Sequence, residues 1–180
     1  MKPHAALLWC ILPLLLAACA GVPPDVDTSV DCRAPQAICR NGRFGLIWQP
    51  QQTAGGEQIA VQALSGNYAW QSLPNGAADL QLNSSLGPAI AQVSVRSGRY
   101  RLRTADGRTI EAASWQALFD QIFPFGFPAQ ALIDWFTSPS PEQPPPLPRG
   151  WRWEVRDRHY RMLHDTATAR GRIDLLPDER

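Results

Sequence analysis

The fold class is decided by residues 90–111, which read IAQVSVRSGRYRLRTADGRTIE. Apolar and polar residues alternate along this stretch, which is the pattern of strands with one buried face. Two turn signals divide it, Ser97-Gly98 and Asp106-Gly107. An Asp-Gly pair between two alternating runs is a strong sign of a β-hairpin. Residues 90–111 therefore predict three consecutive antiparallel strands.

The same alternation extends to both sides of this stretch. On the N-terminal side it recurs in residues 43–48, 59–70 and 80–83. With turn signals about every 8–12 residues, this part of the chain predicts an antiparallel meander of about six strands. Further strand-like pieces follow near the C-terminus, in residues 151–155, 160–163 and 173–175.

The hydrophobic period becomes helical after Ser114, a residue type that caps helix N-termini. Apolar residues then recur on one helical face, at Trp115, Leu118, Phe119, Ile122 and Phe123. Pro124 and Gly126 are expected to end this helix, and Pro128 suits the first turn of a second one. The second helix carries three further large apolar residues, Leu132, Trp135 and Phe136.

A pair of helices with apolar faces must cover one face of the sheet. Two interpretations of the first apolar stripe are open. It packs permanently on the sheet, or it is a lid over an apolar cavity. Residues 138–148 are rich in proline and predict an irregular linker. The folded domain is expected to span residues 42–180 and to be mainly β, of the α+β class.

The N-terminus has the pattern of an export signal. Lys2 precedes an apolar run from Ala5 to Leu16, which is too short to span a bilayer and matches a signal-peptide core. The run closes on Leu16-Ala17-Ala18-Cys19, which resembles a bacterial lipoprotein processing site. We expect residues 1–18 to be removed, Cys19 to be lipidated and residues 19–41 to form a tether. A plain signal peptide with an incidental cysteine is the alternative.

Charge and cysteine content narrow the function classes. Lys2 is the only lysine among 17 Lys and Arg residues, so 16 arginines and 16 acidic residues remain beyond it. This balance lacks the basic excess of nucleic-acid-binding domains. Cys32 and Cys39 would reach an oxidising compartment, so we expect a disulfide that closes a short loop before the first strand. Two thiolates without a nearby histidine are too few for a metal site.

No catalytic constellation stands out. The chain lacks the nucleophile elbow, the P-loop, the H-E-x-x-H motif and the C-x-x-C motif. His159 and His164 are five residues apart, which places them on opposite faces of a strand, so a shared metal is not expected. They are interpreted as solvated polar residues. We therefore expect no enzymatic activity, no metal and no cofactor.

Taken together, these features resemble the LolB family of outer-membrane lipoproteins. The resemblance runs from about Gly42 to Trp135, with a later return strand. Its landmarks follow the family's order and spacing behind the lipoprotein site: Gly42-Arg43-Phe44, Tyr68-Ala69-Trp70-Gln71, Leu80-Gln81-Leu82, Leu86-Gly87, Ala105-Asp106-Gly107-Arg108 and Trp153-Glu154-Val155.

The resemblance implies an incomplete antiparallel β-barrel whose short helices form a lid over an apolar cavity. It implies an outer-membrane-anchored protein facing the periplasm, which accepts lipoproteins from a LolA-like periplasmic carrier and inserts them into the membrane. Ala20 after the lipidated cysteine agrees with the outer membrane. By position Leu86 looks like the family's membrane-inserting loop leucine, although Ser85 replaces the family's proline. Acyl chains are the expected ligands, and a monomer is expected.

The residues expected to line the cavity come from strands and helices alike. They are Phe44, Leu46, Trp48, Tyr68, Trp70, Leu80, Leu82, Trp115, Leu118, Phe119, Ile122 and Trp135. The family continues with another strand beyond the Leu175-Leu176-Pro177 segment, so an open sheet edge is expected here. Two alternatives are kept: a lipoprotein of the same fold that binds another lipid or acts as a scaffold, and a lipid-modifying hydrolase.

Overall fold

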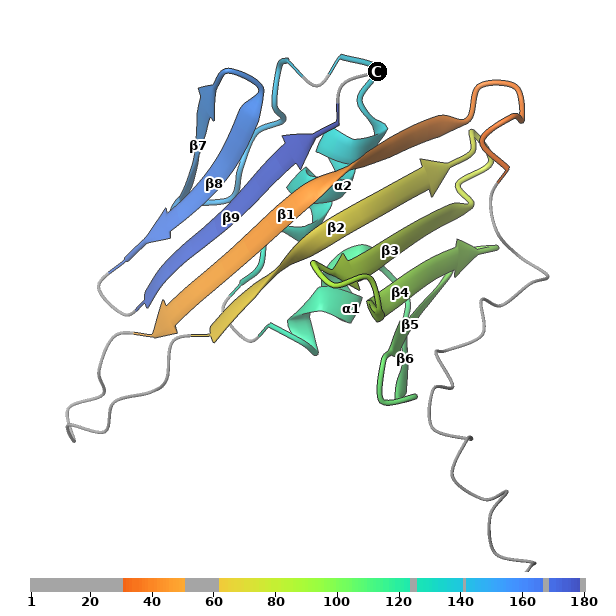
Figure 1. The fold of residues 1–180 in the computed structure, drawn as a ribbon, viewed down its shortest axis with the longest axis horizontal. Coiled ribbons are helices and arrows are strands. Elements are labelled where there is room, and N and C mark those ends of the chain that lie inside the picture. The colour runs from red at the N-terminus through yellow and green to blue at the C-terminus, as the bar shows by residue number, and fades with distance from the viewer. Residues whose placement is uncertain (1–30, 51–61, 124–125, 141, 167–168, 179–180) are drawn as a thin grey trace, which may run out of the picture.

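The computed structural model describes residues 31–50, 62–123, 126–140, 142–166 and 169–178 (Figure 1). The predicted signal peptide, Cys19 and most of the predicted tether lie outside the described residues. The described part contains one sheet and two short helices.

The sheet has nine antiparallel strands in the order β6-β5-β4-β3-β2-β1-β9-β8-β7. It is open, because β6 and β7 are its two edges and do not pair with each other. The mainly β, incomplete-barrel fold with two short helices is thereby confirmed. The strands are β1 (Ile38–Pro50), β2 (Gln62–Ser72), β3 (Ala78–Ser84), β4 (Ala89–Arg96), β5 (Arg99–Thr104), β6 (Thr109–Ala112), β7 (Trp151–Arg156), β8 (His159–Asp165) and β9 (Ala169–Pro177).

The last strand lies in the middle of the sheet. β9 pairs with β1 on one side and with β8 on the other, so it joins the meander β1–β6 to the pair β7–β8. Phe44 lies opposite Leu175, and Leu46 lies opposite Ile173. The open edges are therefore formed by β6 and β7 and not by the C-terminal strand.

The two helices lie on one face of the sheet; in Figure 1, α2 lies behind β1 and β2, and α1 lies toward β3–β6. α1 (Trp115–Asp120) is capped as expected, because the Ser114 hydroxyl accepts a hydrogen bond from the Ala117 amide. It is shorter than its apolar stripe, and the Ile122 and Phe123 amides close the last turn on the Phe119 carbonyl. α2 (Ala129–Thr137) begins directly after Pro128. Neither helix is long and apolar enough to cross a membrane.

The proline-rich segment is irregular, as expected. Its described residues, 138–140 and 142–148, form no helix or strand. The Trp153 indole on edge strand β7 donates to the Pro145 carbonyl at 2.7 Å. This bond fastens the segment to the sheet edge.

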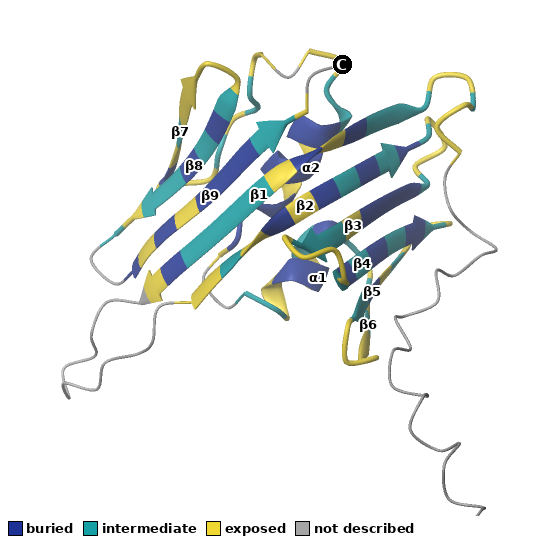
Figure 2. Cartoon of the chain, in the orientation of Figure 1, coloured by how far each residue is buried: buried dark blue, intermediate teal, exposed yellow. Residues whose placement is uncertain are grey.

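Strand alternation separates the sheet into two faces (Figure 2). On the inner face, toward the helices, lie buried aromatic and aliphatic residues such as Trp48, Tyr68 and Trp70. On the outer face, charged side chains dominate; for example, His159, Arg161 and Arg172 all contact Asp174. The core is thus the layer between the inner face and the two helices.

Candidate functional site

The twelve residues predicted to line a cavity come together in one apolar layer. Those on the strands face the helices, and those on α1, on α2 and in the turn after α1 face the sheet. Eight are buried in the core, whereas Phe44, Leu46, Leu82 and Ile122 are partly buried against it. The layer also contains residues that were not predicted as part of the site: Phe127, Phe136, Trp151, Tyr160, Met162, Ile173 and Leu175. Of these, Phe136 contacts the rings of Tyr68, Trp70 and Trp135. Its place among the apolar residues of the second helix could have predicted that it belongs to the layer.

Aromatic rings fill the middle of this layer. Trp70 on β2 stacks on Phe136 of α2, with ring centroids 5.1 Å apart and planes 9° apart. Trp70 also contacts Trp115 of α1 at 5.7 Å. Such ring pairs contribute beyond the area that they bury. α1 and α2 therefore pack directly on the sheet at this point.

A cavity of about 540 Å³ opens at one end of the layer, beside the β2–β3 turn. Small-molecule sites typically enclose ~300–1,000 Å³. Its walls combine aromatic and aliphatic side chains with a few polar ones: Gln36, Ile38, Trp70, Ser72, Leu73, Pro74, Gly76, Ala77, Ala78, Tyr100, Trp115, Gln130, Ile133, Asp134 and Thr137. The cavity thus extends the aromatic layer to the surface, and of the twelve residues predicted to line a cavity only Trp70 and Trp115 line this one, whereas the other ten pack in the layer.

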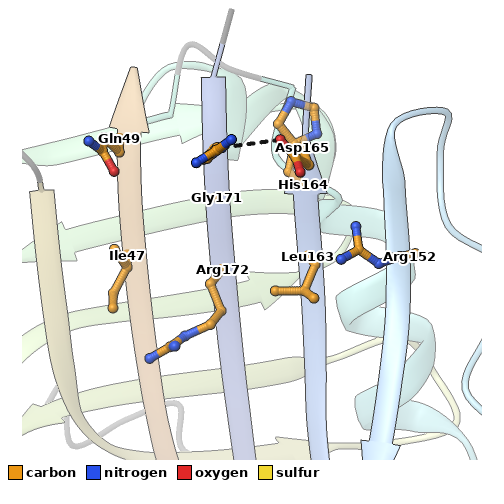
Figure 3. Close-up of a pocket in the computed structure, with 9 residues that line it drawn as sticks. Ile47, Gln49, Arg152, Leu163, His164, Asp165, Gly171 and Arg172 are labelled. Carbon is orange, nitrogen blue, oxygen red and sulfur yellow. Dashed lines mark hydrogen bonds and ion pairs between the residues drawn. The ribbon is translucent and has the colours of Figure 1, made fainter. Parts of the chain in front are cut away.

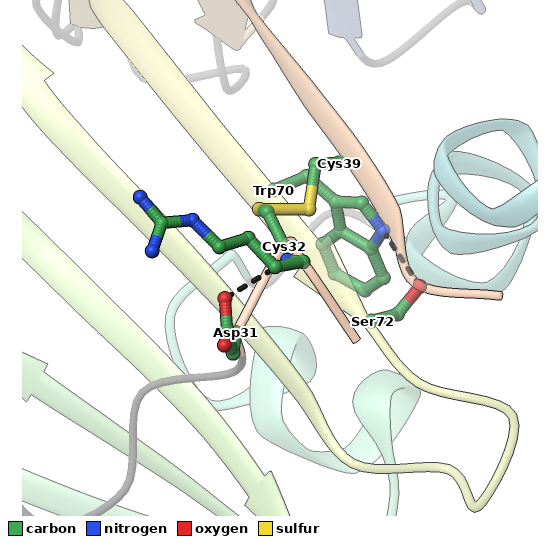
Figure 4. Close-up of a disulfide and its surroundings, with 6 residues drawn as sticks. Asp31, Cys32, Cys39, Trp70 and Ser72 are labelled. Atoms are coloured by element: carbon green, nitrogen blue, oxygen red, sulfur yellow. Dashed lines mark hydrogen bonds between the residues drawn. A yellow bond between two sulfur atoms is a disulfide. The ribbon is translucent and has the colours of Figure 1, made fainter. Parts of the chain in front are cut away.

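The rim of this cavity is held by a disulfide between Cys32 and Cys39 (Figure 4). Cys39 lies inside β1, so the bonded loop overlaps the first strand instead of preceding it. Two residues inside this loop, Gln36 and Ile38, line the cavity. Nearby, the Trp70 indole donates to the Ser72 hydroxyl at 3.2 Å. A short covalent loop restricts the unfolded chain and here also shapes the cavity mouth.

Arg40 ties the C-terminal end of α2 to the sheet. Its Nε donates to the Phe136 carbonyl at 2.8 Å, and a terminal guanidinium nitrogen donates to the Ser138 carbonyl. Carbonyls at a helix C-terminus lack intrahelical partners, and a cation there also complements the helix dipole. Arg40 is not among the site residues predicted from the sequence. Its inward position could have been predicted, because Arg40 is an even number of residues from Phe44 and Leu46 and so lies on the same face of β1.

Leu86 stands alone at the tip of the β3–β4 connection. It is 92% exposed, which makes it by far the most exposed large apolar side chain among the described residues. The turn beneath it is ordered: the Gly87 amide donates to the Ser84 carbonyl, and the Ser84 amide donates to the Pro88 carbonyl. Gly87 has φ +106°, a conformation that suits glycine. The leucine is therefore presented on a tight turn.

The two histidines do not form a shared site. His159 Nε2 contacts Asp174 Oδ1 at 2.9 Å on the outer face. His164 lies between Trp48 and Trp151, with ring centroids 5.5 and 4.9 Å away, so its interpretation as a solvated residue is wrong. Aromatic neighbours cover the ring, and its Nδ1 is buried. In the part of the chain that the structure describes, no group of three His, Cys, Asp or Glu residues is placed to hold a metal ion.

A shallow hollow of about 230 Å³ lies over the outer side of β1, β9, β8 and β7 (Figure 3). Ile47 and Leu163 form its apolar part, and Arg170 pairs with Asp165 at its end. Four of its nine lining residues are charged, Arg152, Asp165, Arg170 and Arg172, whereas Asp134 is the one charged residue in the lining given for the cavity on the other face.

Comparison with known proteins identifies the family. Residues 41–166 match the family model described as outer membrane lipoprotein LolB. A protein of Bordetella petrii named outer-membrane lipoprotein LolB is 34% identical over 121 residues, which cover 67% of this chain and 55% of the relative. Proteins of the same name from Bordetella parapertussis and Vibrio vulnificus are 31% and 27% identical, over 73% and 69% of this chain and 60% and 59% of their own lengths.

The chain thus spans little more than half the length of these relatives. The family match covers most of the sheet and both helices, from within β1 to the end of β8. This chain belongs to the outer membrane lipoprotein LolB family.

Proposed function

We propose that this domain accepts lipoproteins from a LolA-like periplasmic carrier and inserts them into the outer membrane. The observation that carries the proposal is the cavity that leads from the surface to an apolar, aromatic layer between sheet and helices. Family membership and the name shared by the relatives agree with it.

Acyl chains are the ligands that fit such a layer. Burying a methylene group stabilises by ~0.8 kcal/mol, so even partial burial of several chains gives strong binding. The cavity would take the first part of the chains. To admit a longer part of the acyl chains, α2 would have to move away from the sheet, because Phe136 of α2 stacks on Trp70 behind the cavity. Arg40, which bonds the end of α2, would hold this lid closed in the empty protein.

Release needs no nucleotide in this mechanism. Transfer from the carrier requires only a modest affinity difference between two apolar cavities, and the bilayer then offers the chains full burial. No residue of the chain is assigned a catalytic role, and the domain acts as a transport factor and works as a monomer.

The domain would work beside the membrane that receives the cargo. Lipidated Cys19 and the following tether would hold it at the outer membrane, facing the periplasm. Leu86, at 92% exposure, would enter the interface and help to open the path for the chains. A Leu86→Glu variant should accept lipoprotein as before but insert it poorly, because a carboxylate resists transfer into the interface. If the Leu86→Glu variant and the wild type insert lipoprotein equally well, Leu86 does not have this role.

The cavity itself is tested by filling it. Ala77 lines the cavity beside the β2–β3 turn, and an Ala77→Trp substitution should lower the affinity for a fluorescent acyl probe several-fold. Ala105→Trp is the matched control, because Ala105 lies exposed near the β5–β6 turn, away from the cavity. Undiminished binding by the Ala77 variant would place the acyl site elsewhere.

The transport role is tested in cells. Depletion of the protein should cause outer-membrane lipoproteins to accumulate on the carrier or in the inner membrane, measured by membrane fractionation. Normal lipoprotein sorting after depletion would contradict the proposed function.

A further inference from the structure

Two hydrogen-bond donors in the middle of the apolar layer have no partner. Tyr68 is 2% exposed and Trp135 is fully buried, yet neither the Tyr68 hydroxyl nor the Trp135 indole N–H makes a hydrogen bond within the described part of the chain. The large majority of buried side-chain polar atoms in proteins are paired, because an unpaired one loses its hydration without compensation. Two such groups in one layer call for a physical explanation.

The two donors come from opposite walls of the layer. Tyr68 belongs to β2, and Trp135 belongs to α2. Both rings contact Phe136, each with centroids 5.2 Å apart. The Arg40 guanidinium lies 5.9 Å from the Trp135 ring centroid and bonds the Phe136 carbonyl. The donors therefore lie in one region, beneath the C-terminal half of α2.

The backbone makes room for the tyrosine. Gly42 is the register partner of Tyr68, and a Cβ at this glycine would lie 2.7 Å from the Tyr68 hydroxyl oxygen. Only a residue without a side chain allows the hydroxyl to reach over β1 at this point. The backbone therefore leaves space for the Tyr68 hydroxyl, although a phenylalanine at this position would pack equally well against the apolar neighbours.

The two unpaired groups, and the Arg40 guanidinium beside them, can all donate hydrogen bonds. An indole N–H and a guanidinium only donate hydrogen bonds. Burial raises the pKa of Tyr68 far above its ordinary value, against an opposing effect of Arg40 and with smaller raising effects of the exposed Asp178 and of Tyr160, so the hydroxyl keeps its proton. The matching ligand group accepts hydrogen bonds, donates none and is attached to apolar chains. A phosphate would carry its charge into the apolar layer at high cost, whereas an ester carbonyl would not.

We propose that Tyr68 and Trp135 donate hydrogen bonds to the ester carbonyl oxygens of a bound diacylglyceryl group. This inference rests on the proposed binding of lipoprotein acyl chains and names the part of the lipid that the layer recognises. Because one donor belongs to the sheet and the other to α2, the ester would bridge the wall and the lid. The layer would then bind the ester-linked region of the lipid specifically and its hydrocarbon non-specifically.

The test compares two lipids that differ only in the carbonyls. Dipalmitoyl phosphatidylethanolamine and its dihexadecyl ether counterpart compete for the purified protein against a fluorescent acyl probe. The wild-type protein should prefer the ester lipid on the order of tenfold, as expected for a hydrogen bond or two gained. Tyr68→Phe should lose most of this preference and raise the Tm of the empty protein, because it removes an unpaired buried hydroxyl.

Trp153→Phe is the control, since it removes an aromatic N–H that already bonds the Pro145 carbonyl at the β7 edge, outside the cavity lining, and should leave the ester-to-ether ratio unchanged. Equal binding of both lipids by the wild type, or an unchanged ratio in Tyr68→Phe, would overturn the inference and leave acyl-chain binding intact. Failure of the wild type to bind either lipid would instead overturn the proposed function together with the inference.

Discussion

The two faces of one sheet differ in how they contribute to this molecule. On the inner face, side chains of β1–β5, β8 and β9 pack against two helices and form a continuous aromatic and aliphatic layer. On the outer face, neighbouring positions on the same strands carry ion pairs, such as Arg161 and Arg172 with Asp174. Burial of apolar area stabilises the first arrangement, whereas the ion pairs of the buried Asp174 have to offset the cost of taking their charges out of water. Both the stability and the proposed ligand site of the domain therefore reside on the inner face.

The largest difference between the two faces is expected in the free energy of unfolding that is lost when a large apolar side chain is truncated. Trp70→Ala should lower the free energy of unfolding by about 3–5 kcal/mol, because it empties a fully buried position beneath α2. Leu163→Ala, on the outer face, should cost only about 1 kcal/mol, since Leu163 is half-buried. Chemical denaturation of both variants measures the contrast. Similar losses would show that the outer face contributes as much as the inner one.

Two arginines provide the next comparison. Arg40→Leu breaks the bonds to the Phe136 and Ser138 carbonyls, and each such bond from a charged donor contributes about 1.5–3 kcal/mol. Hydrogen exchange in the last turn of α2 should become faster. Arg96→Leu, which breaks bonds to Asp79 and the Ala78 carbonyl, should leave exchange in α2 unchanged. Equal protection of α2 in the Arg40 variant would contradict its role in holding the helix.

Two glycines of β1 test the close approach on the inner face. A Cβ at Gly42 would lie 2.3 Å from the Leu176 carbonyl oxygen and 2.7 Å from the Tyr68 hydroxyl, so Gly42→Ala should cost about 1–3 kcal/mol. A Cβ at Gly45 would meet only the Asp174 side chain, at an ordinary 3.7 Å. Gly45→Ala should change the thermal midpoint little. A larger loss at Gly45 would reverse the expected order.

The smallest effect is expected at the exposed β5–β6 turn. A hydrogen bond from the Thr104 hydroxyl, followed by contacts with Arg108, lowers the pKa of Asp106 in the folded state. A lowered folded pKa means that this contribution is complete above the unfolded value of about 3.9 and is lost as the pH falls through the folded pKa. Asp106→Asn should therefore slightly reduce the acid dependence of the Tm. A steeper acid dependence in the variant would contradict the sign.

Much of the fold could be predicted from local patterns. The alternation of apolar and polar residues predicted strands β1–β6 and their antiparallel order. The Ser114 cap and the helical spacing of apolar residues predicted α1 and α2. Both kinds of pattern depend only on residues that are close together in the chain. The length of α1 was not predictable in this way. Its apolar stripe continues to Phe123, but the last turn closes on Phe119 and the chain then turns through Gly126. The inward arginine at position 40 was missed because a charge was not expected beside an apolar layer.

The amino-acid sequence by itself determined which residues are apolar on each strand, where the turns fall and which family the chain resembles. Those properties follow from side-chain chemistry over a few residues. Only the tertiary structure decided that β9 lies between β1 and β8, that the disulfide loop borders a cavity and that Tyr68 and Trp135 are buried without partners. These features depend on contacts between segments far apart in the chain, which no local pattern encodes.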